Sequence, residues 1–218
     1  MKTVSSSPNQ PMQSIQAALR ATVLAVAFTV PLPQSAQAEP ASLAATPANI
    51  QAPSGNKAFL VGHAVGTQNY ICRRSGSDVK FVLFAPEAVL TKDDQQLTGH
   101  FFSPNPFEPN TEATVTSEHM IRPAWRHSRD TSTVWAKMAP NGTSSVTPEA
   151  IPWLLLQVVG AKEGPTGGHA LTAITFIQRV NTSGGIAPSA GCASPTEIGN
   201  QAFVPYTADY VFYKKTAE

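Results

Sequence analysis

Alternating apolar and polar positions are the main pattern of this chain, and two stretches in its C-terminal half show it best. One is residues 169–180, which we predict to form a central strand that organises the rest of the fold. The other is residues 202–213, in which Tyr206 and Tyr210 fall on one face while Asp209 falls on the opposite face. A period of two with many β-branched and aromatic residues is typical of a β-strand with one face in the core.

Shorter stretches between turn signals predict further strands at residues 58–65, 67–73, 79–85, 99–102, 112–117, 118–122 and 150–159. Pro86 is expected to stop the third of these, and three prolines within residues 103–109 argue against regular structure there. No stretch of the mature chain shows the period of an amphipathic helix. The pattern predicts an all-β protein, a single-domain antiparallel β-sandwich or flattened barrel with long Pro/Gly-rich loops and little helix.

The first 38 residues have the composition of a cleaved signal peptide. Lys2 and Arg20 are basic, residues 21–30 form an apolar stretch too short to span a bilayer, and residues 36–38 read Ala-Gln-Ala. We predict cleavage after residue 38, a flexible lead-in over residues 39–55 and one β domain over residues 56–218. The mature protein is then secreted or periplasmic, with no integral membrane span.

Charge excludes one large class of partner. The 218 residues contain 15 Lys and Arg and 14 Asp and Glu, and loss of the leader brings the mature chain to a net charge of about −1. Proteins that bind nucleic acid carry a basic stripe that this sequence lacks. We therefore expect no nucleic-acid partner.

Cys72 and Cys192 are the only cysteines. An even number of cysteines in an exported protein favours a disulfide. The alternative is a catalytic thiolate at Cys72, beside Arg73 and Arg74, although neighbouring positions on a strand point to opposite faces.

Several motifs together resemble the domain-of-unknown-function family numbered 3455, whose members are exported proteins of bacteria and fungi. They are Ile-Pro-Trp-Leu-Leu-Leu at 151–156, Ile-Gln-Arg-Val-Asn-Thr at 177–182 with the glycines that follow, and Val-Pro-Tyr-Thr-Ala-Asp-Tyr at 204–210. With Tyr-Ile-Cys at 70–72, the resemblance covers nearly the whole mature chain. It implies that both cysteines belong to the family framework, and it implies no activity.

One position departs from the family pattern. Many members read His-Tyr-x-Gly-Pro-Thr-Trp-Glu where this chain has His-Met-Ile-Arg-Pro-Ala-Trp-Arg at 119–126. Arg126 stands in place of the glutamate, so a chemical role of that glutamate is not expected here.

Three histidines, His100, His119 and His127, lie within thirty residues and are candidate metal ligands. Imidazoles from different strands can converge on one ion, but the spacing matches no local ligand motif. The alternative is that they are ordinary surface or hydrogen-bonded histidines. We assign no cofactor.

A polar cluster at residues 125–130 is the candidate ligand-binding patch. Its members are Trp125, Arg126, His127, Arg129 and Asp130. Indole faces and guanidinium groups suit an extracellular ligand, with carbohydrate as one candidate. In the alternative interpretation, Arg129 pairs with Asp130 in a turn and the tryptophan is in the core.

Arg179, Asn181 and Asp209 are expected to be structural polar residues. Arg179 would satisfy loop carbonyls of residues 184–191, with Asp209 as its buried partner. No nucleophile elbow or phosphate loop is present, so the catalytic residues remain unknown.

Two functions are consistent with these features. The first is a non-catalytic exported binding or envelope-associated β domain. The second is an enzyme, with or without a metal, that uses the central His/Arg/Asp cluster. Convergence of His100, His119, His127 and Asp130 in a concave site would favour catalysis, and their dispersal would favour binding.

Overall fold

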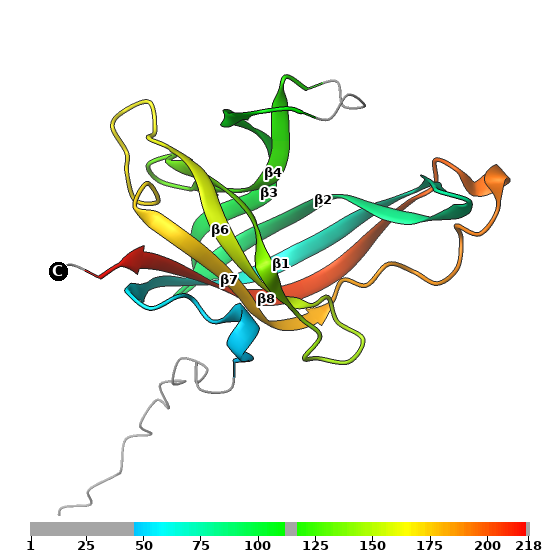
Figure 1. Cartoon of the computed structure of the whole chain (residues 1–218), viewed down its shortest axis with the longest axis horizontal. Helices are drawn as coiled ribbons and strands as arrows, with labels where there is room; N and C mark the ends of the chain where they lie inside the picture. The colour runs from blue at the N-terminus through cyan, green and yellow to red at the C-terminus, as the bar shows by residue number, and fades with distance from the viewer. Residues whose placement is uncertain (1–45, 112–116, 217–218) are drawn as a thin grey trace, which may run out of the picture. The chain divides into compact units, whose positions relative to one another are not determined.

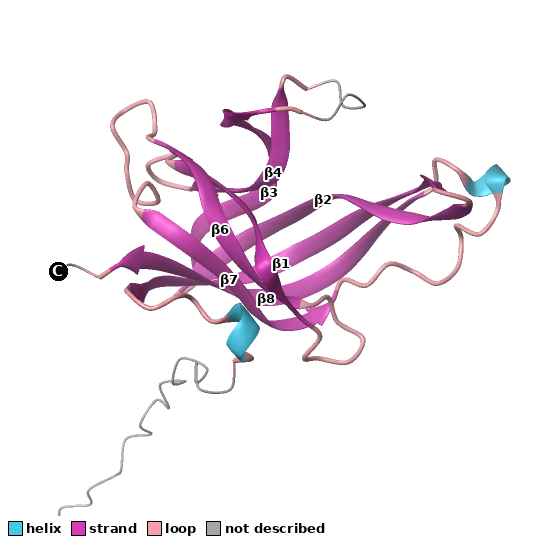
Figure 2. Cartoon of the chain, in the orientation of Figure 1, coloured by secondary structure: helices cyan, strands magenta, loops and turns pink. Residues whose placement is uncertain are grey.

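Eight antiparallel strands close into a barrel in the computed structural model, which describes residues 46–111 and 117–216. The strands pair in chain order and β8 pairs back with β1 (Figure 1). The elements are η2 (Ala48–Ile50), β1 (Asn56–Ser75), β2 (Asp78–Lys92), β3 (Gln95–Pro109), β4 (His119–His127), β5 (Thr133–Ser144), β6 (Trp153–Lys162), β7 (Ile174–Gly184), η3 (Pro195–Glu197) and β8 (Gln201–Lys215). Within the described ranges the helical structure is two short 3₁₀ turns (Figure 2). The all-β prediction is confirmed, and of its two forms the structure is a barrel.

Every second side chain along the strands points into the barrel, and together these side chains fill it. Trp125, Leu156, Ile177, Tyr210 and Phe212 point inward and are almost completely buried in the main core. The two faces predicted for residues 202–213 are therefore correct. Within the closed part of the barrel β7 lies between two partners, because β6 and β8 both hydrogen-bond to it.

Three strands continue past one end of the barrel. Residues 78–87 of β2 pair with β1 but not with β3, and residues 201–205 of β8 pair with β1 but not with β7. With residues 67–75 of β1 they form a projecting sheet (Figure 1). The segment at 185–200 follows this sheet, and the predicted disulfide between Cys72 and Cys192 ties it there. No free cysteine remains, so the thiolate alternative is excluded.

Several predicted strand ends were wrong, and close backbone packing explains one of them. Residues 58–65 and 67–73, which were predicted as two strands, belong to one strand, β1, which continues through Gly66. A Cβ on Gly66 would overlap the Glu87 oxygen and the Ala88 Cα of β2, so the glycine allows the two backbones to approach.

Prolines also interrupt the sheet less than expected. β2 continues through Pro86, which pairs with Gln68 next to a register shift at Asn69 and Tyr70. β3 likewise includes Pro104 and the residues up to Pro109, where its register against β4 shifts. Bulges of this kind accommodate the missing N–H group of proline.

The organising strand begins later than predicted. Residues 170–173 form a turn, and β7 runs from Ile174 to Gly184. Leu171 is still buried in the main core, which explains why its apolar character resembled the start of the strand. The weak strand predicted at residues 112–117 lies almost wholly outside the described residues.

The segment before β1 packs on the barrel, whereas the sequence predicted a flexible lead-in over residues 39–55. Ile50 is fully buried in a cluster with Ala139 and Leu155 on the outside of the barrel. Gln178 Nε2 donates to Ile50 O at 2.6 Å. The buried Ile50 side chain, this hydrogen bond and those from Asn49 Nδ2 to Asn141 O and Thr143 O hold residues 46–55 against the barrel. The predicted signal peptide lies outside the described residues.

No helix in the described part of the chain is long and apolar enough to cross a membrane.

Candidate functional site

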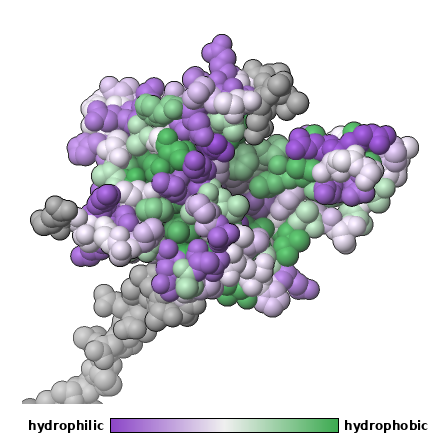
Figure 3. Space-filling view, viewed as in Figure 1, coloured by the Kyte–Doolittle hydropathy of each residue, from purple (hydrophilic) through white to green (hydrophobic). Residues whose placement is uncertain are grey.

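A cavity of about 220 Å³ opens at the end of the barrel from which the projecting sheet extends. We call it the mouth cavity. Its apolar wall consists of Leu83, Pro86, Phe102, Pro123, Trp125, Ile151, Pro152, Leu154 and Leu156. Leu83 at the rim is 37% exposed, whereas Trp125 and Leu156 are buried at the floor. Apolar side chains reach the surface where the barrel meets the projecting sheet (Figure 3).

Five polar side chains interrupt this wall: Gln68, Tyr70, His100, Arg179 and Tyr210. They come from β1, β3, β7 and β8, and each is at an inward position of its strand. The lining contains no aspartate and no glutamate.

His100 is held as a neutral aromatic ring. Its Nδ1 lies 3.0 Å from Ala124 O, and its ring stacks on Trp125 with centroids 4.2 Å apart. A carbonyl oxygen only accepts, so Nδ1 carries the hydrogen and Nε2 keeps a lone pair. Burial lowers the pKa of His100 to about 3, against the smaller opposing effect of the Ala124 hydrogen bond.

Arg179 is the positive charge of the mouth cavity. Its Nε and Nη2 donate to Pro152 O at 3.2 and 2.8 Å. Burial is the main influence on the pKa values of Tyr70 and Tyr206, which it raises, while the Arg179 charge acts in the opposite direction. Its field therefore reaches the tyrosines around the cavity.

Two tyrosines, Tyr70 and Tyr210, line the cavity. Tyr70 donates from its hydroxyl to Gly185 O at 2.6 Å, which joins the wall to the segment that follows β7. The hydroxyls of Tyr206 and Tyr210 lie 3.3 Å apart. Gly185 fits closely there, since a Cβ would be 3.0 Å from Ile151 Cγ2 and from Tyr206 Cβ.

Two buried donors in the wall are unpaired. Gln68 Nε2 and Trp125 Nε1 have no hydrogen-bond partner among the described residues. The Gln68 side chain lies close enough to Tyr206 to lower the pKa of its hydroxyl, but the two groups lack the geometry of a hydrogen bond. A buried donor without an acceptor costs about 1–3 kcal/mol, so such groups need an explanation.

The predicted patch at residues 125–130 does not form one surface. Trp125 points into the barrel, whereas Arg126 is on the outside with its guanidinium 5.5 Å from the Phe101 ring centre. Adjacent strand residues face opposite sides, which separates them. Arg129 donates to Gln95 Oε1, so the expected pairing of Arg129 with Asp130 is wrong.

Asp130 instead organises the turn between β4 and β5. It accepts from Ser132 N and Oγ at 3.0 and 2.7 Å and from Ala170 N at 2.7 Å, and His127 Nδ1 lies 3.1 Å away. Burial alone would raise the pKa of Asp130, but these hydrogen bonds and the nearby His127 lower it to about 2. The carboxylate has a structural role there.

The three candidate metal ligands are not brought together. His100 lies inside the barrel, whereas His119 and His127 are at opposite ends of β4. In the ranges 46–111 and 117–216, no group of three or more His, Cys, Asp or Glu side chains is placed to hold a metal ion.

Arg179 and Asp209 do not form the expected pair. Arg179 on β7 is paired in register with Tyr210 on β8, and both face inward. Asp209 is next to Tyr210 along β8 and therefore faces outward. Asp209 contacts His63 Nδ1 at 2.6 Å and Asn181 Nδ2 at 2.8 Å on the outer surface. The carbonyl that Arg179 satisfies belongs to Pro152 and not to residues 184–191.

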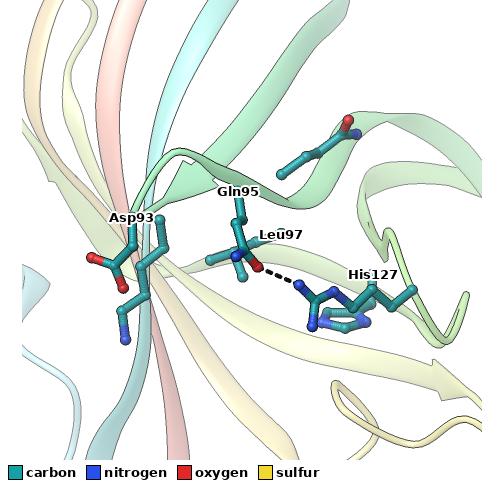
Figure 4. A pocket seen from close by; sticks show the side chains of 7 residues that line it. Asp93, Gln95, Leu97 and His127 are labelled. Carbon is teal, nitrogen blue, oxygen red and sulfur yellow. Dashed lines mark hydrogen bonds between the residues drawn. The ribbon is translucent and has the colours of Figure 1, made fainter. Parts of the chain in front are cut away.

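A second cavity, of about 230 Å³, lies at the turn between β2 and β3 (Figure 4). Its lining includes His127 and Arg129 from the predicted patch, together with Lys92, Asp93 and Gln95. Most of these are exposed side chains of a hairpin turn, and two of the lining residues are joined by the bond from Arg129 to Gln95. It lacks the buried apolar wall of the mouth cavity.

Most polar residues of the mouth cavity were not predicted as site residues. Gln68, Tyr70 and Tyr210 come from strands that the pattern identified, and the alternation placed Tyr210 inward. The missing information was the register between distant strands.

A family model described as "Protein of unknown function (DUF3455)" matches residues 53–214, which include every residue of the mouth cavity. The chain belongs to this family. The resemblance seen in the motifs of the sequence is thereby confirmed. No curated protein and no solved structure matches the chain. Membership in DUF3455 carries no activity with it, so the cavity itself is the guide to function.

Proposed function

We propose that this DUF3455 protein is a non-catalytic, exported binding protein that holds a small ligand in the mouth cavity. The observation that carries the proposal is a concave apolar wall interrupted by a few inward polar groups, one of which, Arg179, keeps unused N–H groups. Small-molecule sites generally have this composition, and the open end of a β-barrel is a common location for them.

The dimensions favour a ligand the size of a single ring. A volume of about 220 Å³ corresponds to roughly seven water molecules at about 30 Å³ each. Aromatic side chains at the floor and rim, Trp125 and Phe102, suit a flat apolar body.

The placement of the titratable residues supports binding over catalysis. His127 and Asp130 lie together in a structural turn, while His100 and His119 lie elsewhere. Inside the mouth cavity His100 has no acidic partner to orient it as a general base, and its pKa of about 3 makes it a poor proton acceptor at neutral pH.

Export is supported by the disulfide. A bond between Cys72 and Cys192 persists in oxidising compartments and is rare in reducing ones. The leader-like composition of residues 1–38 agrees with this, and secreted or periplasmic locations are both consistent.

Saturation-transfer NMR with two neutral ring compounds, indole and benzyl alcohol, tests the proposal. Leu83→Trp places a bulky side chain at the rim, where the native leucine is 37% exposed, so the fold should tolerate it. Phe203→Trp is the matched control because Phe203 is 58% exposed on β8 and lies outside the cavity lining.

We expect saturation transfer to at least one probe with the wild-type protein and with Phe203→Trp, and a marked loss with Leu83→Trp. The probes should be recovered chemically unchanged. Equal signals from all three proteins, or no signal from either probe at millimolar concentration, would contradict the proposal.

A further inference from the structure

We infer that the ligand of the mouth cavity is a small monocarboxylate with an apolar body, and that Arg179 binds its carboxylate. This inference rests on the proposed function and adds the chemical class of the ligand. The juxtaposition that supports it is an inward-facing arginine with unused N–H groups and no acidic partner, in a cavity that no carboxylate lines.

The charge of Arg179 is not compensated within the described residues. The ion pairs there are His63 with Asp209, Arg122 with Glu108, and His127 with Asp130. None of them involves Arg179, and no carboxylate lines the cavity. A partly buried arginine is usually paired, so an anion is the expected complement.

The hydrogen bonds of Arg179 fix its plane and leave donors free. Nε and Nη2 both donate to Pro152 O at the cavity wall, which holds one edge of the guanidinium. Nη1 makes no hydrogen bond within the described ranges. A guanidinium has five N–H groups, and those left over match the oxygens of a carboxylate.

The sign of the charge in the cavity favours an anion over a cation. An amine would add a second positive charge beside Arg179, whereas a carboxylate would compensate the charge that is already there.

The charge expected of the ligand follows from the number of cations in the cavity lining. His100 is neutral at physiological pH, so Arg179 supplies the single positive charge of the lining. One cation balances one carboxylate. The remaining wall is apolar and aromatic, which favours a hydrocarbon or ring as the body of the ligand.

Three probes of the same shape separate charge from fit: phenylacetate, phenylacetamide and 2-phenylethylamine. Affinities are measured by titration calorimetry at pH 7 with the wild-type protein, Arg179→Gln, Arg179→Lys and Arg126→Gln. Arg126 is the matched control because it is an exposed arginine on the outer face of β4. Thermal melting of each variant checks that it is folded.

We expect wild-type protein and Arg126→Gln to bind phenylacetate about tenfold or more tightly than phenylacetamide, and the amine most weakly. Arg179→Gln should abolish the preference for the anion, and Arg179→Lys should restore part of it.

Equal binding of phenylacetate and phenylacetamide by the wild-type protein would overturn the carboxylate inference while leaving the proposed binding function intact. Preferential binding of the amine would overturn it as well. Binding of none of the three probes would count against both proposals. Because the wild-type protein alone distinguishes the three probes, these outcomes hold even where an Arg179 variant fails to fold.

Discussion

Acid should destabilise this protein through His100 well before its carboxylates are protonated. The folded state keeps His100 neutral, with a pKa of about 3, while the unfolded chain protonates it near 6.5. A histidine whose pKa is depressed by folding contributes its full stability above about pH 6.5, and that contribution is lost as the pH falls toward 3.

The magnitude follows from the difference in proton binding. Between pH 6.5 and 5 the unfolded state takes up a proton that the folded state does not, and each pH unit costs about 1.4 kcal/mol. His100 should therefore lower the free energy of unfolding by about 2 kcal/mol between pH 7 and pH 5. Glu108 and Asp130 each have a folded pKa of about 2. Their protonation lowers the free energy of unfolding only below their ordinary pKa values of 4.5 and 3.8, so they do not contribute in this window.

Urea unfolding at pH 7, 6 and 5 measures this effect. His100→Phe keeps an aromatic ring against Trp125 and removes the titrating group. The free energy of unfolding of the wild type, relative to that of the variant, should therefore fall by about 2 kcal/mol from pH 7 to pH 5. His169→Gln, at an exposed histidine, is the control and should leave the wild-type slope unchanged. A stability difference between wild type and His100→Phe that stays constant from pH 7 to pH 5 would refute the reasoning.

Two further predictions concern the framework. Replacing Cys72 and Cys192 by serine opens a bond between residues 120 apart, and we expect the free energy of unfolding to fall by about 2–5 kcal/mol in non-reducing urea titrations; a midpoint equal to that of the oxidised wild type would contradict this. Gly66→Ala should destabilise the fold by on the order of 3 kcal/mol or more, because its Cβ overlaps the backbone of β2. Gly99→Ala has open space around the new Cβ and serves as the control, so similar losses in both variants would exclude the steric explanation.

The parts of the fold that were predicted correctly depend on local periodicity or on composition. Alternation placed Tyr206 and Tyr210 on the inner face of β8, and two cysteines in a chain with a predicted leader indicated the disulfide. Both inferences use information that lies within a short stretch or in a simple count. Neither requires knowledge of which strands are neighbours.

The parts that were missed depend on contacts between distant strands. Gly66 looked like a break in the strand because the atoms that exclude a Cβ at this position belong to β2, which the local sequence does not show. Residues 46–55 looked unstructured because the hydrophobic surface that receives Ile50 is formed by β5 and β6. Arg179 and Asp209 looked like a pair because both are polar residues in apolar strands, yet the register puts them on opposite faces.

The mouth cavity is the clearest case of this dependence on register. Three local features determine its wall: the register shift at Tyr70, the close fit of Gly185 against Ile151, and the Pro152 carbonyl that orients Arg179. They lie on different strands and loops, so no short sequence motif predicts them. The Tyr70 hydroxyl and the Gly185 carbonyl join β1 to the same segment that Cys192 ties to the projecting sheet. The disulfide therefore does more than restrict the unfolded chain, because it also holds the segment whose Gly185 carbonyl accepts the hydrogen bond from the cavity residue Tyr70.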